Sequence, residues 1–97
     1  MNMQALMQQA QKMQRDITKK KEELDKKEFT GSSEMVDVVF TGDKKLSSVK
    51  IKIDIENDDK EVLEDMITIA VNNAMDQIDK ETDKIMGPYG NQLGGLF

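Results

Sequence analysis

Apolar residues recur at alternating three- and four-residue steps along the first part of the chain. This spacing gathers them on one face of a helix, in the heptad pattern of a helix that packs against another. Residues 2–27 contain no Gly or Pro and consist mostly of good helix formers, so we predict a helix there. Lys20 and Lys27 fall where apolar residues belong, so we expect the seam to weaken toward its end. The apolar seam comprises Met3, Leu6, Ala10, Met13, Ile17 and Leu24, and Met7 widens it near its start.

The length of this helix sets a requirement on its surroundings. Residues 2–27 would span roughly 39 Å at 1.5 Å per residue. A compact chain of about 100 residues has a radius of gyration near 13 Å. Something must cover the seam, and we expect a partner helix, a partner chain or both.

From residue 28 onward, the pattern changes from helical to alternating. Apolar residues alternate with polar ones over two stretches, which predicts strands at 35–41 and 46–55 in an antiparallel hairpin. Gly42 is expected to supply the permissive backbone of the turn. One face of the hairpin should be buried and the other should meet water. Residues 28–33 are expected to add a short first strand. The alternating apolar residues are Val36, Val38, Phe40, Val49, Ile51, Ile53 and Ile55.

A second long helix is predicted over residues 58–86. Asp58 can cap it, with Glu61 closing a capping box. Gly87 and Pro88 end the helix. Its broad apolar stripe comprises Val62, Leu63, Met66, Ile67, Ala70, Val71, Ala74, Ile78 and Ile85.

The predicted elements form a single α+β domain over residues 1–86, followed by a Gly-rich tail over 87–97. The tail has four Gly and one Pro and few charges, so we expect it to be flexible. Leu93, Leu96 and Phe97 would allow it to dock on an apolar surface.

Composition narrows the range of chemistry. The chain has 97 residues and 37% hydrophobic content, which supports one small domain with a modest core that self-association would help. It contains no Cys and no His, so disulfides, thiolate metal sites and the commonest general base are absent. No carboxylate pair or phosphate-binding Gly loop stands out. We therefore expect no enzyme activity, no cofactor and no small-molecule substrate. The eight Met residues are more typical of a core or an adaptable partner surface than of a metal site.

No apolar run approaches the roughly 18 residues that a membrane span needs, so we expect a cytoplasmic protein without a membrane partner. The net charge is −5, unevenly distributed. Residues 57–97 carry nine acidic and three basic side chains, whereas residues 1–28 carry five acidic and seven basic ones. The basic end of the chain is thus the predicted first helix.

A row of cations lies opposite the apolar seam on the predicted first helix. We name Lys12, Arg15, Lys19 and Lys26 the basic stripe. Two interpretations remain open from spacing alone. The stripe is either a solvated face of a dimeric adaptor that binds proteins through its Met-rich helix ends, or a surface that contacts phosphates, with Lys44 and Lys45 of the hairpin as secondary candidates.

Short motifs along the whole chain resemble those of the YbaB/EbfC family of small bacterial nucleoid-associated proteins. Each motif is weak, but their order and spacing together are fairly specific. They are Leu-Met-Gln-Gln-Ala-Gln-Lys-Met-Gln at residues 6–14, Phe-Thr-Gly at 29–31, Thr-Gly-Asp at 41–43, Val-Lys-Ile-Lys-Ile-Asp at 49–54, Leu-Glu-Asp at 63–65, Asn-Asn-Ala at 72–74 and Gly-Leu-Phe at 95–97.

The resemblance implies an α+β homodimer in which sheets and second helices associate while the first helices protrude. It also implies binding to double-stranded DNA and an influence on nucleoid organisation or gene expression. With it, the phosphate interpretation of the basic stripe becomes the expected one, in a cytoplasmic protein associated with the nucleoid. The residues expected in the core or dimer interface are Met3, Leu6, Met13, Ile17, Leu63, Met66, Ile67, Ala70 and Ala74.

Overall fold

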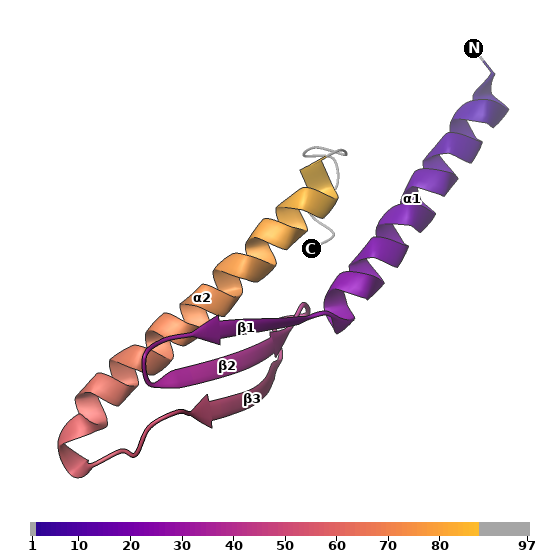
Figure 1. The fold of residues 1–97 in the computed structure, drawn as a ribbon. Coiled ribbons are helices and arrows are strands. Elements are labelled where there is room, and N and C mark those ends of the chain that lie inside the picture. Colours follow the sequence, from indigo (N-terminus) through magenta and orange to yellow (C-terminus); the bar gives the residue numbers. More distant parts are fainter. Residues whose placement is uncertain (1, 88–97) are drawn as a thin grey trace.

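A long helix, a three-stranded sheet and a second long helix follow one another along the chain (Figure 1). The computed structural model describes residues 2–87, so residues 88–97 of the predicted flexible tail lie outside the described residues. The α+β architecture predicted from the hydrophobic pattern is confirmed. The elements are α1 (Met3–Lys26), β1 (Glu28–Ser32), β2 (Val36–Thr41), β3 (Leu46–Ile51), the short 3-10 helix η1 (Asn57–Asp59) and α2 (Lys60–Met86).

The three strands form an antiparallel sheet in the order β1-β2-β3. Phe29 pairs with Phe40, and Val38 pairs with Val49. Cross-strand partners point to the same face, so alternate residues of β1 and β2 build one apolar face. On that face Phe29, Val36 and Val38 are buried, whereas the intervening residues are more exposed.

Helix α2 packs across β1 and β2 at very close range (Figure 1). Ala70 and Ala74 are fully buried at this contact. A Cβ on Gly31 would lie 2.0 Å from the Ala70 carbonyl oxygen and 2.7 Å from the Ala74 backbone nitrogen. The small residues on both sides therefore allow the helix backbone to approach the strand directly. The Gln77 amide fixes the alignment by donating to the Thr30 carbonyl at 2.7 Å.

Strand β3 differs from the prediction in length and in burial. It ends at Ile51 rather than at residue 55, because its partner β2 begins at Val36, directly opposite Ile51. One further bond, from the Lys52 N–H to the Met35 carbonyl at 2.8 Å, closes the ladder. All residues of β3 are exposed, including Val49 (50%) and Ile51 (49%). The buried face therefore ends at β2, because α2 does not extend over the third strand.

The hairpin turn uses Gly42 for a different reason from the one predicted. The residue with a left-handed backbone is Lys44, at φ 66°, not Gly42. Gly42 is needed because a Cβ there would lie 1.8 Å from the Leu24 carbonyl oxygen at the base of α1. The Gly42 N–H also donates to the Lys27 carbonyl at 2.9 Å. This glycine therefore joins the hairpin to the helix.

The N-terminal part of α2 is also organised differently. The predicted cap at Asp58 and Glu61 is replaced by one two residues earlier, with η1 between the cap and the helix. The Glu56 N–H donates to Asp59 Oδ2 at 3.2 Å, and the Asp59 N–H donates to the Glu56 carbonyl at 3.0 Å. Both capping positions are still acidic residues, as predicted, but the capping box begins two residues earlier in the sequence.

Helix α1 extends away from the rest of the fold, with its N-terminus at the far end (Figure 1). Within this one chain, the covered part of its seam is the later half. Ile17 and Leu24 are buried at 4% exposure, whereas Met3 (74%) and Leu6 (41%) are exposed. Leu24 joins the core because β1 begins just after it and brings the end of α1 onto the sheet. We call the projecting part of α1 the arm, residues 3–16.

Candidate nucleic-acid interface

The basic stripe follows one line along α1. At 3.6 residues per turn, Lys12, Arg15, Lys19 and Lys26 fall within about 60° of the helix circumference and cover about 21 Å of its length. All four side chains are exposed. The buried seam residues Ile17 and Leu24 lie on the other side of the helix. The stripe therefore faces away from the fold on a rigid support.

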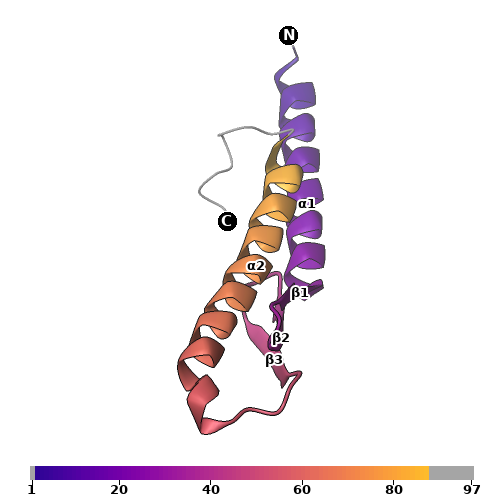
Figure 2. The ribbon, with the colours of Figure 1, turned by 60° about the vertical axis from the view of Figure 1, so that its left-hand side comes forward.

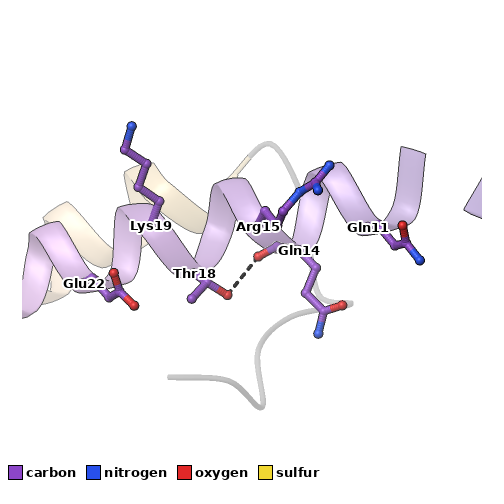
Figure 3. A pocket seen from close by; sticks show the side chains of 6 residues that line it. All are labelled: Gln11, Gln14, Arg15, Thr18, Lys19 and Glu22. Carbon is purple, nitrogen blue, oxygen red and sulfur yellow. Dashed lines mark hydrogen bonds between the residues drawn. The ribbon is translucent and has the colours of Figure 1, made fainter. Parts of the chain in front are cut away.

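Figure 3 shows the middle of this surface. Arg15 and Lys19 extend from one side of α1, whereas Gln14 and Thr18 point to the other. The Thr18 hydroxyl donates to the Gln14 carbonyl at 2.8 Å, which occupies it within the helix. A depression runs here, and all of its described lining residues come from α1. The hollow is open to solvent, and Arg15 and Lys19 lie beside amide and hydroxyl groups in it, which suits an extended anionic ligand better than a small molecule.

Most lysines outside the basic stripe form ion pairs, and the four stripe cations differ from them. Within residues 2–87, none of them forms an ion pair. By contrast, Lys27 pairs with Glu81 at 3.4 Å, and Lys52 pairs with Asp37 at 3.1 Å. The stripe charges are therefore not neutralised by a close carboxylate in the described part of the chain.

Acidic side chains flank the stripe on both sides. Asp16 and Glu23 lie along one edge and Glu22 along the other, within about 80° of the line of cations at 100° per residue. These carboxylates lower the positive potential beside the stripe and repel a phosphate that lies away from the line of cations. The stripe is therefore a narrow cationic track on a mixed surface.

The structure does not bring Lys44 and Lys45 together with the basic stripe. Lys44 lies beside Lys21 and Asp25 at the base of α1, on a different face of the helix. It pairs with Asp79 at 3.6 Å, and Lys45 pairs with Asp43 at 3.8 Å.

Asp43 is held in its charged form at this turn. A hydrogen bond from the Thr41 hydroxyl, with a smaller contribution from the charge of Lys45, lowers the pKa of the Asp43 carboxyl below its ordinary value. The hairpin lysines are therefore already paired, Lys45 with Asp43 of the turn and Lys44 with Asp79 of α2.

The residues predicted for the core or the interface fall into two groups. Ala70, Ala74 and Ile17 are buried, and Leu63, Met66 and Met13 are partly buried. The exposed members are Met3, Leu6 and Ile67.

A further apolar surface was not predicted as exposed. It is formed by Val49 and Ile51 of β3 and by Ile53, which follows that strand. Their alternation in the sequence predicts a buried face, and it does not distinguish a cover within the same chain from a cover by a partner chain. We name these three residues together with Ile67 the outer apolar face.

Two kinds of site are not found in the part of the chain that the structure describes. No helix between residues 2 and 87 combines the length and the apolar character that a bilayer span requires. Over the same residues, no group of three or more acidic side chains is arranged to hold a metal ion.

Comparison with known proteins agrees with this geometry. The model of the YbaB/EbfC DNA-binding family matches residues 1–93. The chain is 46% identical over 96 residues to the nucleoid-associated protein gbs1791 of Streptococcus agalactiae serotype III, covering 96% of this chain and 97% of that protein. A nucleoid-associated protein of Ligilactobacillus salivarius is 42% identical over 99 residues, with 99% and 95% covered. One from Enterococcus faecalis is 39% identical over 98 residues, with 98% and 94% covered.

Proposed function

Because the chain belongs to the YbaB/EbfC DNA-binding family, we propose that it is a nucleoid-associated protein that binds duplex DNA as a homodimer through the basic stripe. It is a DNA-binding protein rather than an enzyme. The observation that carries the binding site is the line of four exposed cations on α1, none of them in an ion pair within residues 2–87. In the cell it would act in the cytoplasm on the nucleoid, influencing its organisation or gene expression.

The chemistry of the stripe supports backbone contacts more than base reading. Lysine acts on phosphate as a point charge, whereas arginine offers the bidentate geometry that recognises a guanine edge. Arg15 is the only arginine of the chain. Contacts to phosphate position a protein on DNA without conveying sequence. We therefore expect modest sequence discrimination, with Lys44 and Lys45 as secondary phosphate contacts.

The outer apolar face supports the dimer. Val49 and Ile51 share a face with Val38 and Val36, their cross-strand partners, which α2 buries. The apolar surface thus continues past the edge of α2 onto β3 without a cover in the same chain. Strand β3 pairs only with β2, so its other edge is free within the described residues. A free edge beside an apolar face is a template for association with another chain.

Ile67 belongs to the same surface by its position around α2. Asn73 accepts a hydrogen bond from the Ser32 N–H at 3.2 Å, and Gln77 bonds to Thr30, so this flank of α2 faces β1. Residue 67 lies about 20° from residue 74 around the helix, on the side that faces the sheet, yet Ile67 is 37% exposed. A two-fold symmetric contact that pairs this patch with its copy would cover both at once.

The experiment that tests the DNA site compares two variants with equal loss of charge. One replaces Lys12, Arg15, Lys19 and Lys26 with Gln, and the control replaces Lys50, Lys60, Lys80 and Lys84 with Gln. If four to six phosphates are contacted, the logarithm of wild-type affinity falls against the logarithm of salt concentration with a slope of about −3.6 to −5.4. The stripe variant is expected to lose binding and most of this slope at low salt. The control is expected to keep the slope.

Equal losses in both variants would show that net charge rather than the stripe governs binding. An absence of binding by the wild type at low salt would favour the second candidate, a dimeric protein adaptor. The exposed methionines Met3 and Met7 at the arm tip favour this alternative, since methionine suits adaptable protein-binding surfaces.

A further inference from the structure

The tip of the arm carries an apolar surface that the proposed DNA contact does not use. Met3, Leu6 and Met7 are all exposed there, on the side opposite the basic stripe. A helix of about 12–15 residues without packing is only marginally stable in water. The arm has that length, and its Gln-rich turns have little charge pairing to support them. An apolar partner along this side would therefore stabilise the arm.

The arm tip and the C-terminal segment share an unusual composition. Charged residues make up 34% of the chain, yet residues 1–11 and 85–97 contain no Asp, Glu, Lys or Arg. Burying charged side chains is costly, so two uncharged segments can pack together without that cost. Residues 93, 96 and 97 of the second segment are Leu, Leu and Phe. These two segments are thus chemically matched.

The fold directs the C-terminal segment toward the arm. Helices α1 and α2 run antiparallel, and the C-terminal end of α2 points toward the same end of the molecule as the N-terminus of α1 (Figures 1 and 2). Ile85 lines the same hollow as Lys20 and Leu24, which places the last turn of α2 level with the base of the arm. From there α1 continues without α2 beside it.

The chain beyond α2 is long enough to follow the arm. Leu6 lies 14 residues from Lys20 along a helix, or about 21 Å. Leu93 is eight residues from Ile85; the first two continue the helix at about 1.5 Å each and the other six reach about 20 Å when extended, about 23 Å in all. Both Leu96 and Phe97 reach further. The distance to be covered and the available chain therefore agree.

We propose that residues 88–97 lie along the exposed part of the apolar seam of their own chain, with Leu93, Leu96 and Phe97 against Met3, Leu6 and Met7. The C-terminal segment then supplies the apolar partner that α2 is too short to provide. The basic stripe lies on the other side of α1 and stays open to DNA. This contact does not depend on DNA binding, so either proposal can fail without the other.

Single cysteine pairs test the contact cleanly because the chain has no Cys. Ala10→Cys places a thiol on the apolar seam, and Gly94→Cys places one between Leu93 and Leu96 without removing an apolar side chain. The control pair combines Gly94→Cys with Gln8→Cys, which lies about 160° away around α1. Disulfide formation under mild oxidation is followed on non-reducing gels.

The pair with Ala10→Cys is expected to close within one chain about tenfold faster than the Gln8→Cys pair, since docking raises the effective concentration of the thiols. Replacing Leu96 and Phe97 with Ser is expected to remove the difference. Equal rates on both faces of the helix would overturn the proposal. Disulfides between two chains would also overturn it, and would assign the seam to another copy of the protein.

Hydrogen exchange provides a second measurement on the full-length chain. A variant with Leu93, Leu96 and Phe97 replaced by Asn is expected to show faster amide exchange over residues 3–13 and unchanged exchange over residues 62–80. Unchanged exchange in the arm would contradict the docking of these residues.

Discussion

At the scale of single residues, two glycines allow backbones to touch where a side chain would separate them. Gly31 lies against the Ala70 carbonyl and Gly42 against the Leu24 carbonyl. An added Cβ would lie 2.0 Å from the first carbonyl oxygen and 1.8 Å from the second. Neither residue has a positive φ. The requirement is therefore space between elements, which no local sequence pattern signals.

Gly31→Ala is expected to destabilise the protein by about 1–3 kcal/mol, since the added methyl group meets backbone atoms of α2 that cannot rotate away. Gly87→Ala is the matched control. Gly87 has helical angles of φ −49° and ψ −47°, and an added Cβ meets nothing within 4 Å. That change is expected to leave stability unchanged or raise it by up to about 1 kcal/mol. Urea denaturation measures both, and equal effects would contradict the close contact.

Asp37 is expected to make stability depend on pH. The neighbouring Ser32 hydroxyl and, next, the Lys52 ammonium, whose Nζ lies 3.1 Å from Oδ1, lower the pKa of the Asp37 carboxyl below its ordinary value of 3.8. The charged carboxylate therefore stabilises the folded state above pH 3.8, and this stabilisation is lost as the pH falls through the lowered pKa.

Asp37→Asn should accordingly lower the free energy of unfolding at pH 7, and its difference from the wild type should shrink in acid. Ser32→Ala removes the largest single cause and should show part of the same effect. Denaturation curves at the two pH values measure these differences. A wild-type-to-variant difference that is the same at pH 7 and well below pH 3.8 would rule out this role for Asp37.

At the scale of elements, α1 divides into a docked base and a projecting arm. The heptad pattern predicted a seam that is strongest near the N-terminus, but the buried positions are Ile17 and Leu24. Periodicity identified the apolar face of α1 correctly. Which half of that face is buried depends on where β1 leaves the helix and brings it onto the sheet. The pattern along α2 was more informative, because Ala70, Ala74 and Ile78 are buried as the stripe predicted.

Alanine substitutions at the two ends of the seam distinguish these halves. Leu24→Ala is expected to cost about 2–5 kcal/mol in the free energy of global unfolding, because Leu24 is part of the buried core. Leu6→Ala is expected to cost clearly less, about 1 kcal/mol, since Leu6 is 41% exposed and only the proposed docking of the C-terminal segment would cover it. Denaturant melts of both variants provide the measurement. A larger cost at Leu6 would restore the seam as the sequence pattern described it.

At the scale of the whole molecule, the described fold is too elongated to bury its apolar residues alone. The radius of gyration is 18.9 Å and the extents are 70 × 20 × 15 Å. A compact chain of about 100 residues has a radius of gyration near 13 Å. Together with the outer apolar face, this shape favours the homodimer of the proposed function, in which two projecting arms present two basic stripes.

A pair of substitutions on opposite faces of β3 tests the dimer. Ile51→Asn places an amide in the outer apolar face and is expected to shift the protein toward the mass of one chain in light scattering at micromolar concentration. Ser48→Asn puts the same side chain on the other face of the strand and is expected to leave the mass at that of two chains. A wild type with the mass of one chain, or equal behaviour of the two variants, would contradict the interface.

The sequence by itself determined the local structure and the chemistry of the surface. Helical and alternating periods are set by neighbouring residues, so α1, the strands and α2 followed from them, as did the line of cations at Lys12, Arg15, Lys19 and Lys26. Motif order also identified the family. These properties depend on short stretches of chain, and the sequence contains them directly.

Only the tertiary structure decided which apolar faces are covered. Val38 and Val49 alternate in the same way, yet α2 buries the first and leaves the second exposed. Gly42 was recognised as a turn residue, but its contact with Leu24 depends on how α1 meets the hairpin. Burial depends on which segments meet in space. The hydrophobic period of a helix or of a strand does not determine the path that the helix takes across the sheet.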